Sequence, residues 1–431
     1  MKVLVLGSGG REHAILWALG KTSPSVGRLY CVPGNAGIAE VAECRSISLN
    51  DISSLTRFVR DEGIALTIVG PEAPLASGIV DDFERSGLAI VGPLRAAARL
   101  ESSKVFAKDF MARHGIPTAD YRVVHSSAEA EKILRSGIFG SPDSRTVVKA
   151  DGLAAGKGVI VADTRAEAEK AASLLMSGKL IGHEAAKQLL LEQALQGTEA
   201  SVLLFADGKD YALMPSARDH KRIGEGDTGP NTGGMGSITD GSVINPPILN
   251  RVVHEIVEPT LEGARAEGFP FRGVLFLGLM LTADGPKLLE YNVRLGDPEA
   301  QAILVRLKTS LIDIANAIHA GRLGTIKVEW TDESSACVIL ASKGYPGEYK
   351  LGVPIEGLDH VGENDHLRVF HAGTSRLERG NFLTAGGRVL GVTANDQTLE
   401  KALDRCYGAI EKIGWEGMQY RRDIGKFGGK F

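Results

Sequence analysis

Three polar side chains, Glu290, Asn292 and Arg294, occupy alternate positions of the stretch Leu-Leu-Glu-Tyr-Asn-Val-Arg. The apolar residues around them predict a strand, and because side chains alternate along a strand, the three should share one face. Carboxylate and amide oxygens are hard ligands suited to Mg2+, which takes few protein ligands and completes its shell with water and phosphate oxygens. A neighbouring guanidinium can hold a carboxylate or phosphate. A half-buried strand with a polar outer face is the alternative, and the stretches upstream favour the metal site.

A glycine-rich stretch, residues 151–158, follows a predicted strand at residues 145–150. A glycine-rich loop between two antiparallel strands can close over a triphosphate with its backbone amides, and lysines nearby supply positive charge. The spacing does not fit the P-loop pattern. A flexible surface hairpin is the alternative. The candidate nucleotide ligands of this stretch are Lys149, Gly152, Gly156, Lys157 and Gly158.

The chain begins with a predicted strand at residues 2–6, a turn at residues 7–10 and a helix at residues 11–19. This arrangement gathers backbone N–H groups and the positive end of a helix dipole, which suits a phosphate. A dinucleotide-binding fold is the obvious inference, but Glu12 stands where its third glycine should be. The second predicted strand ends in residues 33–35, Pro-Gly-Asn, where an acid for the ribose would be expected. A smaller phosphorylated ligand is therefore favoured.

Strands and helices continue to alternate up to residue 93, with strands at 66–69 and 89–91 and helices at 51–61 and 75–85. Such alternation predicts a doubly wound parallel sheet, whose ligands bind beyond the carboxyl ends of the strands. The Gly-Pro pairs after the strands could also be ordinary turns. Their shared edge favours a site that includes Gly9, Gly10, Asn35 and Glu72.

Two acids flank the next pair of predicted strands. Glu192 ends a strand that begins at Leu189, and Glu199 precedes the apolar run 200–205. Groups at such a strand exit can meet an adenine edge and ribose hydroxyls, although either acid alone would be interpreted as a solvated charge.

Residues 217–237 have no periodic apolar pattern and contain six glycines. A structureless connection of this length is uncommon in a compact domain and is usually functional or disordered. An interdomain linker is one interpretation. A predicted helix at 248–266 and strands at 273–282 and 286–293 continue the same unit, which favours a catalytic loop.

The composition of the 431-residue chain, 43% hydrophobic and 24% charged, is that of a globular protein with two to four domains. A net charge of -4 gives no overall basic footprint for nucleic acid. The four cysteines form neither a CxxC pair nor a disulfide-rich pattern. No signal peptide precedes the first strand, and no apolar run is long enough to span a membrane. These features predict a soluble cytoplasmic protein that binds neither nucleic acid nor membrane.

Three stretches resemble the motifs of the phosphoribosylamine-glycine ligase family, also called glycinamide ribonucleotide synthetases: residues 147–158, 219–236 and 290–301. The resemblance extends from the first strand to residues 422–425. It implies an α/β ATP-grasp fold with an N-terminal doubly wound parallel-sheet domain, a small lid domain, a central grasp domain and a C-terminal α/β domain. The implied boundaries are 1–101, a connecting helix at 102–120, a lid at 121–195, a central domain at 196–324 and a C-terminal domain at 325–431.

The activity implied is the joining of glycine to 5-phosphoribosylamine in purine biosynthesis. ATP would phosphorylate the glycine carboxylate, and the amine would then displace phosphate from glycyl phosphate, leaving glycinamide ribonucleotide, ADP and phosphate. Mg2+, with Mn2+ as an alternative, would be held by Glu290 and Asn292 and neutralise charge at the γ-phosphate. This chemistry requires no protein nucleophile.

The site residues implied by the resemblance fall into three groups. Arg294 would grip the carboxylate or acyl phosphate, Asp219 would hold the ammonium group of glycine, and Lys149 would act beside them. ATP would be bound by Lys104, Lys149, Gly152, Gly156, Lys157, Gly158, Glu192, Leu195 and Glu199. The other substrates would be bound by Gly9, Gly10, Asn35, Glu72, Asp219, Arg294, Gly296 and Asp297.

Two apolar exchanges depart from the family pattern, Leu277 for alanine and Leu295 for an aromatic residue, and neither touches the polar set. The resemblance also implies a monofunctional bacterial-type enzyme, and we expect a monomer. Beyond residue 325 the sequence indicates structure. His371 and Arg376 could reach the substrate from this part of the chain, but both are expected to be satisfied surface residues. The tail 428–431 is expected to fray.

Three other functions are alternatives. A nicotinamide oxidoreductase would leave the motifs at 149–158 and 290–301 unexplained. A catalytically silent nucleotide-binding regulator would keep Lys149 and Glu290 without turnover. An ATP-grasp ligase for a different acid and amine is the third alternative.

Overall fold

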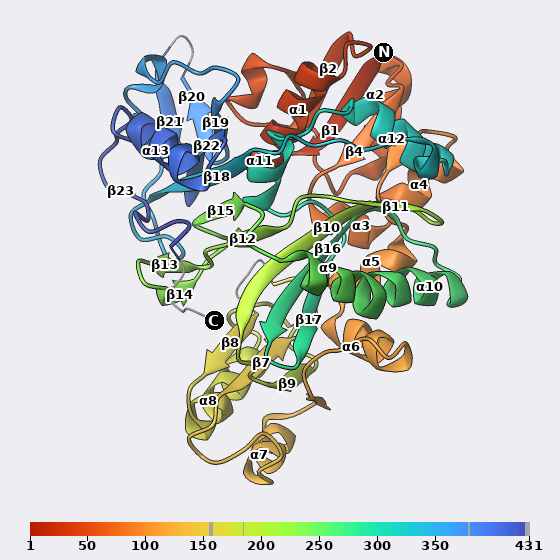
Figure 1. Ribbon diagram of the computed structural model, residues 1–431, viewed down its shortest axis with the longest axis vertical. Coiled ribbons are helices and arrows are strands. Elements are labelled where there is room, and N and C mark those ends of the chain that lie inside the picture. The colour runs from red at the N-terminus through yellow and green to blue at the C-terminus, as the bar shows by residue number, and fades with distance from the viewer. Residues whose placement is uncertain (155–157, 184, 378–379, 427–431) are drawn as a thin grey trace.

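The computed structural model describes residues 1–154, 158–183, 185–377 and 380–426. Two of the predicted site residues, Gly156 and Lys157, and the tail 428–431 lie outside the described residues. Figure 1 shows the N-terminal part in red and orange, the C-terminal part in blue, and a smaller yellow part built around α7 and α8 (Ser127–Arg135 and Arg165–Met176). The long strands β10 (Thr198–Asp207), β16 (Arg272–Thr282) and β17 (Gly285–Asn292) run between these parts.

The N-terminal sheet contains five described strands in the order β3-β2-β1-β4-β5, and every pair is parallel. Its central strand is a fully buried run of valine and leucine, as parallel strands covered on both faces require. This confirms the predicted doubly wound sheet. The elements are β1 (Lys2–Gly7), α1 (Gly10–Thr22), β2 (Arg28–Pro33), β3 (Glu43–Cys44), α2 (Ile52–Glu62), β4 (Leu66–Val69), α3 (Glu72–Ser77), α4 (Ile79–Arg85) and β5 (Ile90–Val91).

The helix predicted at 75–85 is two helices. They divide at Gly78, whose φ of 91° is a left-handed value that favours glycine and ends α3. Helices α5 (Arg95–Ser102) and α6 (Lys104–Arg113) then lead out of the N-terminal part.

A four-stranded sheet follows, in the order β6-β9-β7-β8, with strands β6 (Tyr121–Val124), β7 (Thr146–Ala150), β8 (Val159–Ala162) and β9 (Leu189–Gln193). Val148 and Leu191 belong to the apolar cluster that this sheet forms with α7 and α8. Because side chains alternate along a strand, Lys149 and Glu192 face the opposite side. β7 and β8 pair antiparallel, as expected for strands joined by the glycine-rich loop.

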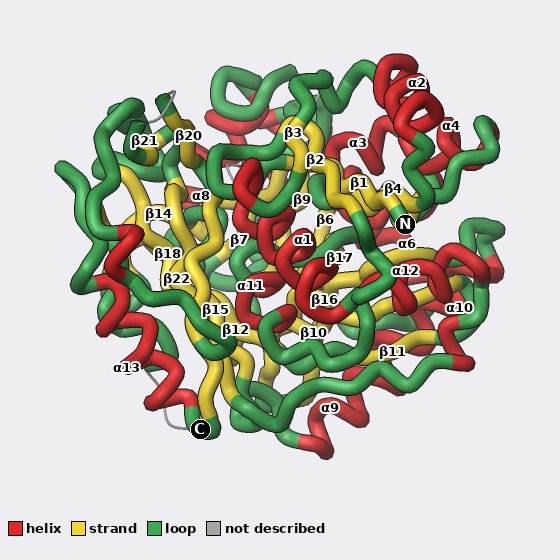
Figure 2. Tube along the Cα trace, turned by 90° about the horizontal axis from the view of Figure 1, so that it is seen from above, coloured by secondary structure: helices red, strands yellow, loops and turns green. Residues whose placement is uncertain are grey.

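Strands of the predicted central and C-terminal domains form one continuous sheet, with the path β17-β16-β10-β12-β15-β18-β22-β19 among the described residues. The view in Figure 2 follows this sheet from β10 and β16 to β18 and β22. Its strands are β10 (Thr198–Asp207), β11 (Tyr211–Leu213), β12 (Ala217–Asp219), β15 (Gly236–Thr239), β16 (Arg272–Thr282), β17 (Gly285–Asn292), β18 (Ser334–Ser342), β19 (Leu367–His371), β22 (Arg388–Asp396) and β23 (Met418–Gln419).

The helices and remaining short elements surround this sheet. The helix predicted at 248–266 is present, with a π-helical segment in its middle. The elements are α9 (Pro246–Val252), a π-helix (Val253–Val257), α10 (Glu258–Ala266), α11 (Glu299–Leu304), α12 (Leu311–Ala320), β20 (Thr374–Arg376), β21 (Phe382–Thr384) and α13 (Leu399–Ile410).

The expectation that residues 217–237 are structureless was wrong. The segment contains β12, the hairpin strands β13 (Arg222–Gly224) and β14 (Thr228–Asn231), and the start of β15. β12 pairs with β15 antiparallel, Ala217 opposite Thr239, inside the long sheet. Strands of three or four residues are too short to display an alternating pattern, and their backbone hydrogen bonds come from distant partners. The sheet thereby fixes Asp219 at the end of β12.

The expectation that His371 lies at the surface was also wrong. Only 6% of its surface is exposed, its backbone N–H donates to His13 Nδ1 at 2.9 Å, and its ring is 3.1 Å from Thr374 Oγ1. Burial lowers its pKa to about 4. His371 therefore joins the C-terminal part to α1. Arg376 is half exposed, as expected, and pairs with Glu40 at 2.8 Å.

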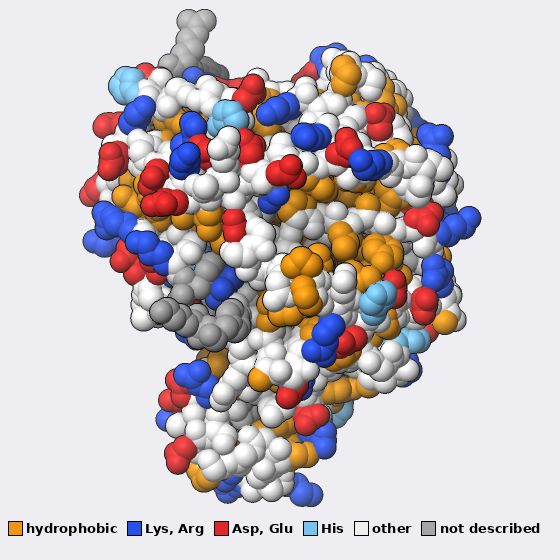
Figure 3. All heavy atoms as spheres, in the orientation of Figure 1, with side chains coloured by type: hydrophobic (Ala, Val, Ile, Leu, Met, Phe, Trp, Pro, Cys, Tyr) orange, Lys and Arg blue, Asp and Glu red, His pale blue; other side chains and the backbone are white. Residues whose placement is uncertain are grey.

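No described helix is long and apolar enough to cross a membrane. On the face drawn in Figure 3, acidic and basic side chains are interspersed.

Candidate active site

Four cations from four segments converge on Glu290, in β17. Lys104 is the first residue of α6, Lys149 lies in β7, Lys221 lies between β12 and β13, and Arg294 follows β17. Burial opposes the ionisation of Glu290, but the charges of these four side chains outweigh it and lower its pKa. The site therefore places an ionised carboxylate among several positively charged side chains, which suits phosphate and carboxylate ligands.

Arg294 links the end of β17 to the N-terminal part. Its Nη2 donates to Asn292 Oδ1 at 3.1 Å, which shows that Asn292 and Arg294 lie on the same side, as the alternation predicted. Its Nε lies 3.3 Å from Glu72 Oε2, and Nη2 lies 2.8 Å from Glu101 Oε1. The other oxygen of Glu101 accepts from the Val293 N–H at 2.7 Å. Arg294 is thus oriented by acids from two helices.

Glu101 is a site residue that the sequence did not reveal. It is buried near the end of α5, and burial raises its pKa although the charge of Arg294 opposes this. The only hint in the sequence was that this acid falls on the apolar face of an alanine-rich helix, which indicates a buried carboxylate.

Lys149 and Glu192 form a buried ion pair, with Nζ 2.9 Å from Oε2. Lys149 also donates to the Leu289 carbonyl oxygen in β17 at 3.3 Å, so it connects the two sheets. Lys108, from α6, approaches the same Glu192 oxygen at 3.1 Å. Burial lowers the pKa of Lys108 to about 8 although Glu192 opposes the shift. The sequence reasoning passed over Lys108 because a single lysine in a helix is ordinarily a solvated charge.

The start of the glycine-rich loop lies beside Lys104, whose Nζ is 3.5 Å from the Gly152 carbonyl oxygen. Asp151 accepts from the Val105 N–H at 3.1 Å and from Gln188 Nε2 at 2.6 Å, which ties the loop to α6. An open cleft of about 430 Å3 is lined here by Ser102, Asp151, Gly152, Leu153, Ile181, Gly182, His183 and Ala185. Gly158, at the far end of the loop, accepts from the Ala150 N–H at 2.8 Å through its carbonyl oxygen.

The predicted ribose acid, Glu199, is the second residue of β10 and pairs with Lys221 at 3.1 Å. Asp219, two residues before Lys221, has its pKa raised to about 7 by burial, with the charges of Glu299 and Glu199 adding to the shift. Leu195 is half-buried in the connection between β9 and β10. The structure thus brings Glu199, Lys221 and Asp219 to the same edge as Glu290.

At the N-terminal turn, the carboxylate of Glu12 accepts from the Gly9 N–H at 2.5 Å and closes the first turn of α1. Glu12 Oε1 also accepts a hydrogen bond from Nε of the buried Arg11 at 2.7 Å. A Cβ at Gly70 would collide with the Glu12 side chain. Glu12, which stands where the dinucleotide-binding motif has its third glycine, thus fills the space between the first turn and the end of β4.

The other N-terminal candidates lie close to this turn. Asn35 donates to the carbonyl oxygens of Ser8 at 2.8 Å and His371 at 2.9 Å, and accepts from the Ile38 N–H at 2.9 Å. Gly10 abuts the Gln301 side chain, and Glu72 meets Arg294. The predicted meeting of the strand-end turns is confirmed.

Asp297 is held by a residue from the far end of the chain. Arg388, in β22, places Nη2 3.2 Å from Asp297 Oδ2 and Nη1 2.7 Å from the Asp297 carbonyl oxygen. Gln301 donates to Oδ1 at 2.9 Å. Burial opposes ionisation of Asp297, but Arg388 and Arg11 lower its pKa. Gly296, the preceding residue, packs closely against Glu299.

The donor set fits a metal ion that takes few protein ligands. Glu290 offers a carboxylate with a lowered pKa, and Asn292 offers an amide oxygen two positions along the same strand. The described residues contain no group of three or more histidine, cysteine, aspartate or glutamate side chains placed to hold a metal. A hard cation that keeps water and phosphate oxygens, such as Mg2+, suits this set better than one requiring a full protein cage.

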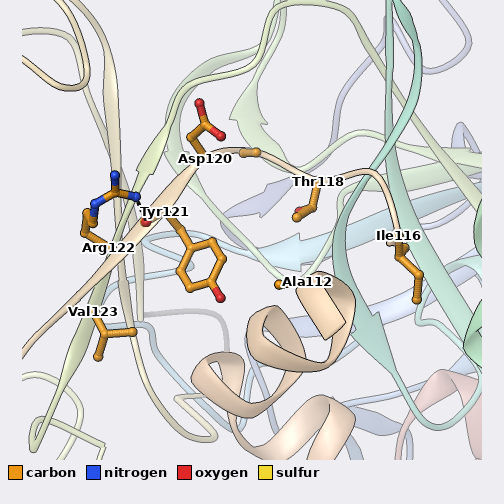
Figure 4. Close-up of a pocket in the computed structure, with 8 residues that line it drawn as sticks. Ala112, Ile116, Thr118, Asp120, Tyr121, Arg122 and Val123 are labelled. Atoms are coloured by element: carbon orange, nitrogen blue, oxygen red, sulfur yellow. Dashed lines mark hydrogen bonds between the residues drawn. The ribbon is translucent and has the colours of Figure 1, made fainter. Parts of the chain in front are cut away.

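A second open cleft, of about 490 Å3, lies where the chain passes from α6 to β6 (Figure 4). Its lining is Ala112, Ile116, Thr118, Ala119, Asp120, Tyr121, Arg122 and Val123. None of the predicted site residues is among them. Thr118 accepts from Lys108 Nζ at 2.6 Å and donates to the Leu288 carbonyl oxygen at 2.6 Å, so this connection is joined to α6 and to β17.

Comparisons with known proteins agree with this architecture. Residues 1–101, 102–300 and 335–427 match the N domain, the ATP-grasp (A) domain and the C domain of phosphoribosylglycinamide synthetase. A crystal structure of phosphoribosylamine-glycine ligase from Thermotoga maritima superposes with a TM-score of 0.82 at 34% identity, covering 98% of this chain and all of that chain. The biotin carboxylase domain of Hydrogenobacter thermophilus 2-oxoglutarate carboxylase, 16% identical with a TM-score of 0.73, shares the fold over 97% of this chain and 91% of its own. The predicted ATP-grasp fold is confirmed.

Curated relatives named phosphoribosylamine-glycine ligase match along almost the whole chain. The protein of Caldanaerobacter subterraneus subsp. tengcongensis is 46% identical over 424 residues, 98% of this chain and 99% of its own length. That of Brucella melitensis is 46% identical over 425 residues, 99% of this chain and 97% of its own. By the three domain matches and these full-length relatives, the chain belongs to the phosphoribosylamine-glycine ligase family.

Proposed function

We propose that this chain ligates glycine to 5-phosphoribosylamine at the expense of ATP, giving glycinamide ribonucleotide, ADP and phosphate in purine biosynthesis. The observation that carries the proposal is the convergence of Lys104, Lys149, Lys221 and Arg294 on Glu290. A reaction that brings a triphosphate and a carboxylate together needs such a concentration of positive charge. The activity named for the full-length relatives supports the choice of substrates.

ATP would lie between the four-stranded sheet and β17, where Lys149 already spans the gap. Lys104, Lys149 and the loop ending at Gly158 would hold its phosphates. Glu192 and Leu195 would meet the adenine, and Glu199 would meet the ribose. The proposed nucleotide ligands in full are Lys104, Lys149, Gly152, Gly156, Lys157, Gly158, Glu192, Leu195 and Glu199.

Glu290 and Asn292 would hold Mg2+, with Mn2+ as the alternative. When bound, the ion would neutralise charge on the transferred phosphoryl group. Asn292 Oδ1 accepts from Arg294 in the ligand-free protein. An amide oxygen has two lone pairs, so it can serve both the guanidinium and a cation.

In the first step an oxygen of the glycine carboxylate attacks the γ-phosphorus of ATP, and ADP departs. Arg294 would hold this carboxylate in line, and Asp219 would hold the ammonium group. In the second step the amine of phosphoribosylamine attacks the carbonyl carbon of glycyl phosphate and expels phosphate. Lys149 would offset the negative charge that develops on the phosphoryl oxygens.

Phosphoribosylamine would bind across the carboxyl edge of the N-terminal sheet and the start of α11. Asp297 and Gly296 approach this edge from one side, since Asp297 lies next to the Gly9 position. The proposed ligands of the two substrates together, glycine and phosphoribosylamine, are Gly9, Gly10, Asn35, Glu72, Asp219, Arg294, Gly296 and Asp297.

The proposed domains are residues 1–101, a connecting helix at 102–120, a lid at 121–195, a central domain at 196–324 and a C-terminal domain at 325–431. We propose a cytoplasmic monomer whose partners are small molecules, with neither nucleic acid nor membrane as a ligand. The buried free thiols of Cys31, Cys337 and Cys406 suit a reducing compartment. The interspersed charges in Figure 3 suit small-molecule ligands better than a polyanion.

The test is ADP release from MgATP with glycine and freshly generated phosphoribosylamine, each component being omitted in turn. The proposal expects ADP and glycinamide ribonucleotide in equal amounts only when all components are present. ADP formed only with another acid or amine would overturn the substrate assignment. No ADP with any pair would favour a catalytically silent nucleotide-binding protein.

A further inference from the structure

Glu192 is a buried carboxylate whose two oxygens have different surroundings. Oε2 is shared by two ammonium groups, Lys149 at 2.9 Å and Lys108 at 3.1 Å. Oε1 is buried and has no hydrogen-bond partner among the described residues. The side chain as a whole is 1% exposed. A buried acceptor without a donor is costly, so its presence calls for an explanation such as a ligand that supplies the donor.

The Glu192 side chain lies on the side of the four-stranded sheet that faces β17. Leu191, the neighbour of Glu192, packs into the cluster beneath α7 and α8, so Glu192 points to the other side. Lys149 occupies that side too and reaches the Leu289 carbonyl oxygen in β17. Glu192 thus lies in the region assigned above to the adenine.

Lys108 gives Glu192 a support that is independent of the cleft. Lys108 is 2% exposed, its ammonium group donates to Thr118 Oγ1 at 2.6 Å, and Thr118 donates in turn to the Leu288 carbonyl oxygen at 2.6 Å. These contacts fix the Lys108 side chain against the connection between α6 and β6 and, through Thr118, against β17. If Lys149 turned towards phosphate, Glu192 would still have one cation, and a buried carboxylate left with none would be strongly destabilising.

We infer that Lys108 is a positioning residue for nucleotide selection: it fixes Glu192 so that Oε1 accepts from an exocyclic amino group of the base. The inference rests on the proposed function, because it takes the bound nucleotide to be ATP. Adenine carries an amino group at position 6, whereas hypoxanthine carries a carbonyl oxygen there. A 6-oxo base would place one acceptor against another and leave Oε1 unpaired, which binding sites reject strongly.

The test measures binding of MgADP and of MgIDP, whose base is hypoxanthine, by calorimetry without glycine or phosphoribosylamine. Wild-type protein should bind ADP about 100-fold more tightly than IDP, since a buried acceptor is satisfied by one base alone. Lys108→Met should weaken ADP binding about tenfold or more and change IDP binding by less than about threefold. Lys108→Arg, which keeps the charge, should restore most of the preference for ADP.

Two further variants separate positioning from a general effect on the fold. Lys170→Met removes an exposed lysine of α8 and should leave both affinities unchanged. Glu192→Gln can present an N–H to a 6-oxo group, so its preference for ADP over IDP should fall even if Lys108→Met fails to fold. In active preparations of Lys108→Met, KM for ATP should rise while KM for glycine stays at the wild-type value.

Equal loss of ADP and IDP affinity in Lys108→Met would overturn the inference, because that result describes a structural residue only. So would a wild-type protein that binds IDP as tightly as ADP, although the ligase function could then still stand. A wild-type protein that binds neither nucleotide would overturn the proposed function itself and this inference with it.

Discussion

Replacing Arg388 by methionine should destabilise the protein and disorder the loop that carries Asp297. The guanidinium, 20% exposed, joins the C-terminal part to two loops of the site. It contacts Asp297 Oδ2 at 3.2 Å and donates to the carbonyl oxygens of Asp297 at 2.7 Å and Gly234 at 3.4 Å. It also donates to the Gly233 carbonyl oxygen. Methionine keeps much of the apolar length but none of these bonds.

The loss of unfolding free energy in Arg388→Met depends on which stabilising contacts Asp297 keeps. Truncating one partner of a buried ion pair typically costs about 3–5 kcal/mol, because the other charge is left uncompensated. Asp297 would keep Gln301 at 2.9 Å and the nearby charge of Arg11. We therefore expect the lower end of that range, a loss of about 3 kcal/mol in the free energy of unfolding.

Urea unfolding of wild type, Arg388→Met and Arg405→Met provides the measurement. Arg405 pairs with Asp396 at 2.6 Å near the end of β22, but it is 45% exposed, so its loss should cost about 1 kcal/mol or less. Arg388→Met should also raise KM for phosphoribosylamine. If the two variants unfold within about 1 kcal/mol of each other, the reasoning about Arg388 is refuted.

The same substitution has a predictable pH dependence. The pKa of Asp297 is lowered in the folded protein, so its contribution is fully present above the unfolded-state pKa of about 3.9 and is lost as pH falls through the folded value. The stability difference between wild type and Arg388→Met should therefore be constant near neutral pH and shrink below about pH 4.

Two further substitutions test the site. Glu290→Gln should lower kcat by about a thousandfold or more, because the proposed metal ion loses the negative charge of its carboxylate ligand, which lies among four cations. The circular dichroism spectrum should stay unchanged. Wild-type turnover in this variant would contradict the metal assignment. Burial raises the pKa of Asp219 to about 7, so ionising this acid weakens the fold as pH rises from about 4 to 7. Asp219→Asn should then be more stable than ligand-free wild type at pH 8 by at least about 1 kcal/mol, with the difference vanishing near pH 4. If Asp219→Asn and wild type melt at the same temperature at pH 8 as well as at pH 4, the pKa of Asp219 is not raised.

Local sequence patterns predicted the elements that are long and regular. The N-terminal strands, the strand carrying Glu290 and Asn292, and the antiparallel pair around the glycine-rich loop were all predicted from apolar runs and turns. Alternation along the predicted strand also placed Asn292 and Arg294 on one side, and the hydrogen bond between them agrees, although β17 ends at Asn292.

The failures concern structure that distant partners impose. β12 and β13 are three residues long, and β12 is defined by its neighbours β10 and β15 rather than by a pattern of its own. Glu101 forms an ion pair with Arg294, a residue that is far from it in the sequence. Periodicity indicates that a side chain is buried, but not which charge lies opposite it, so Lys108, Glu101 and Arg388 could not be assigned from the sequence.

The most direct test of the central claim, that the cluster around Glu290 activates glycine by phosphorylating its carboxylate, is oxygen transfer from [18O2]glycine. If glycyl phosphate forms, one 18O atom must appear in each inorganic phosphate released, and the amide product must retain the other. Glu290→Gln should show neither product nor transfer. Product formation with unlabelled phosphate would contradict the account, because the carboxylate oxygen would then never have been bonded to phosphorus.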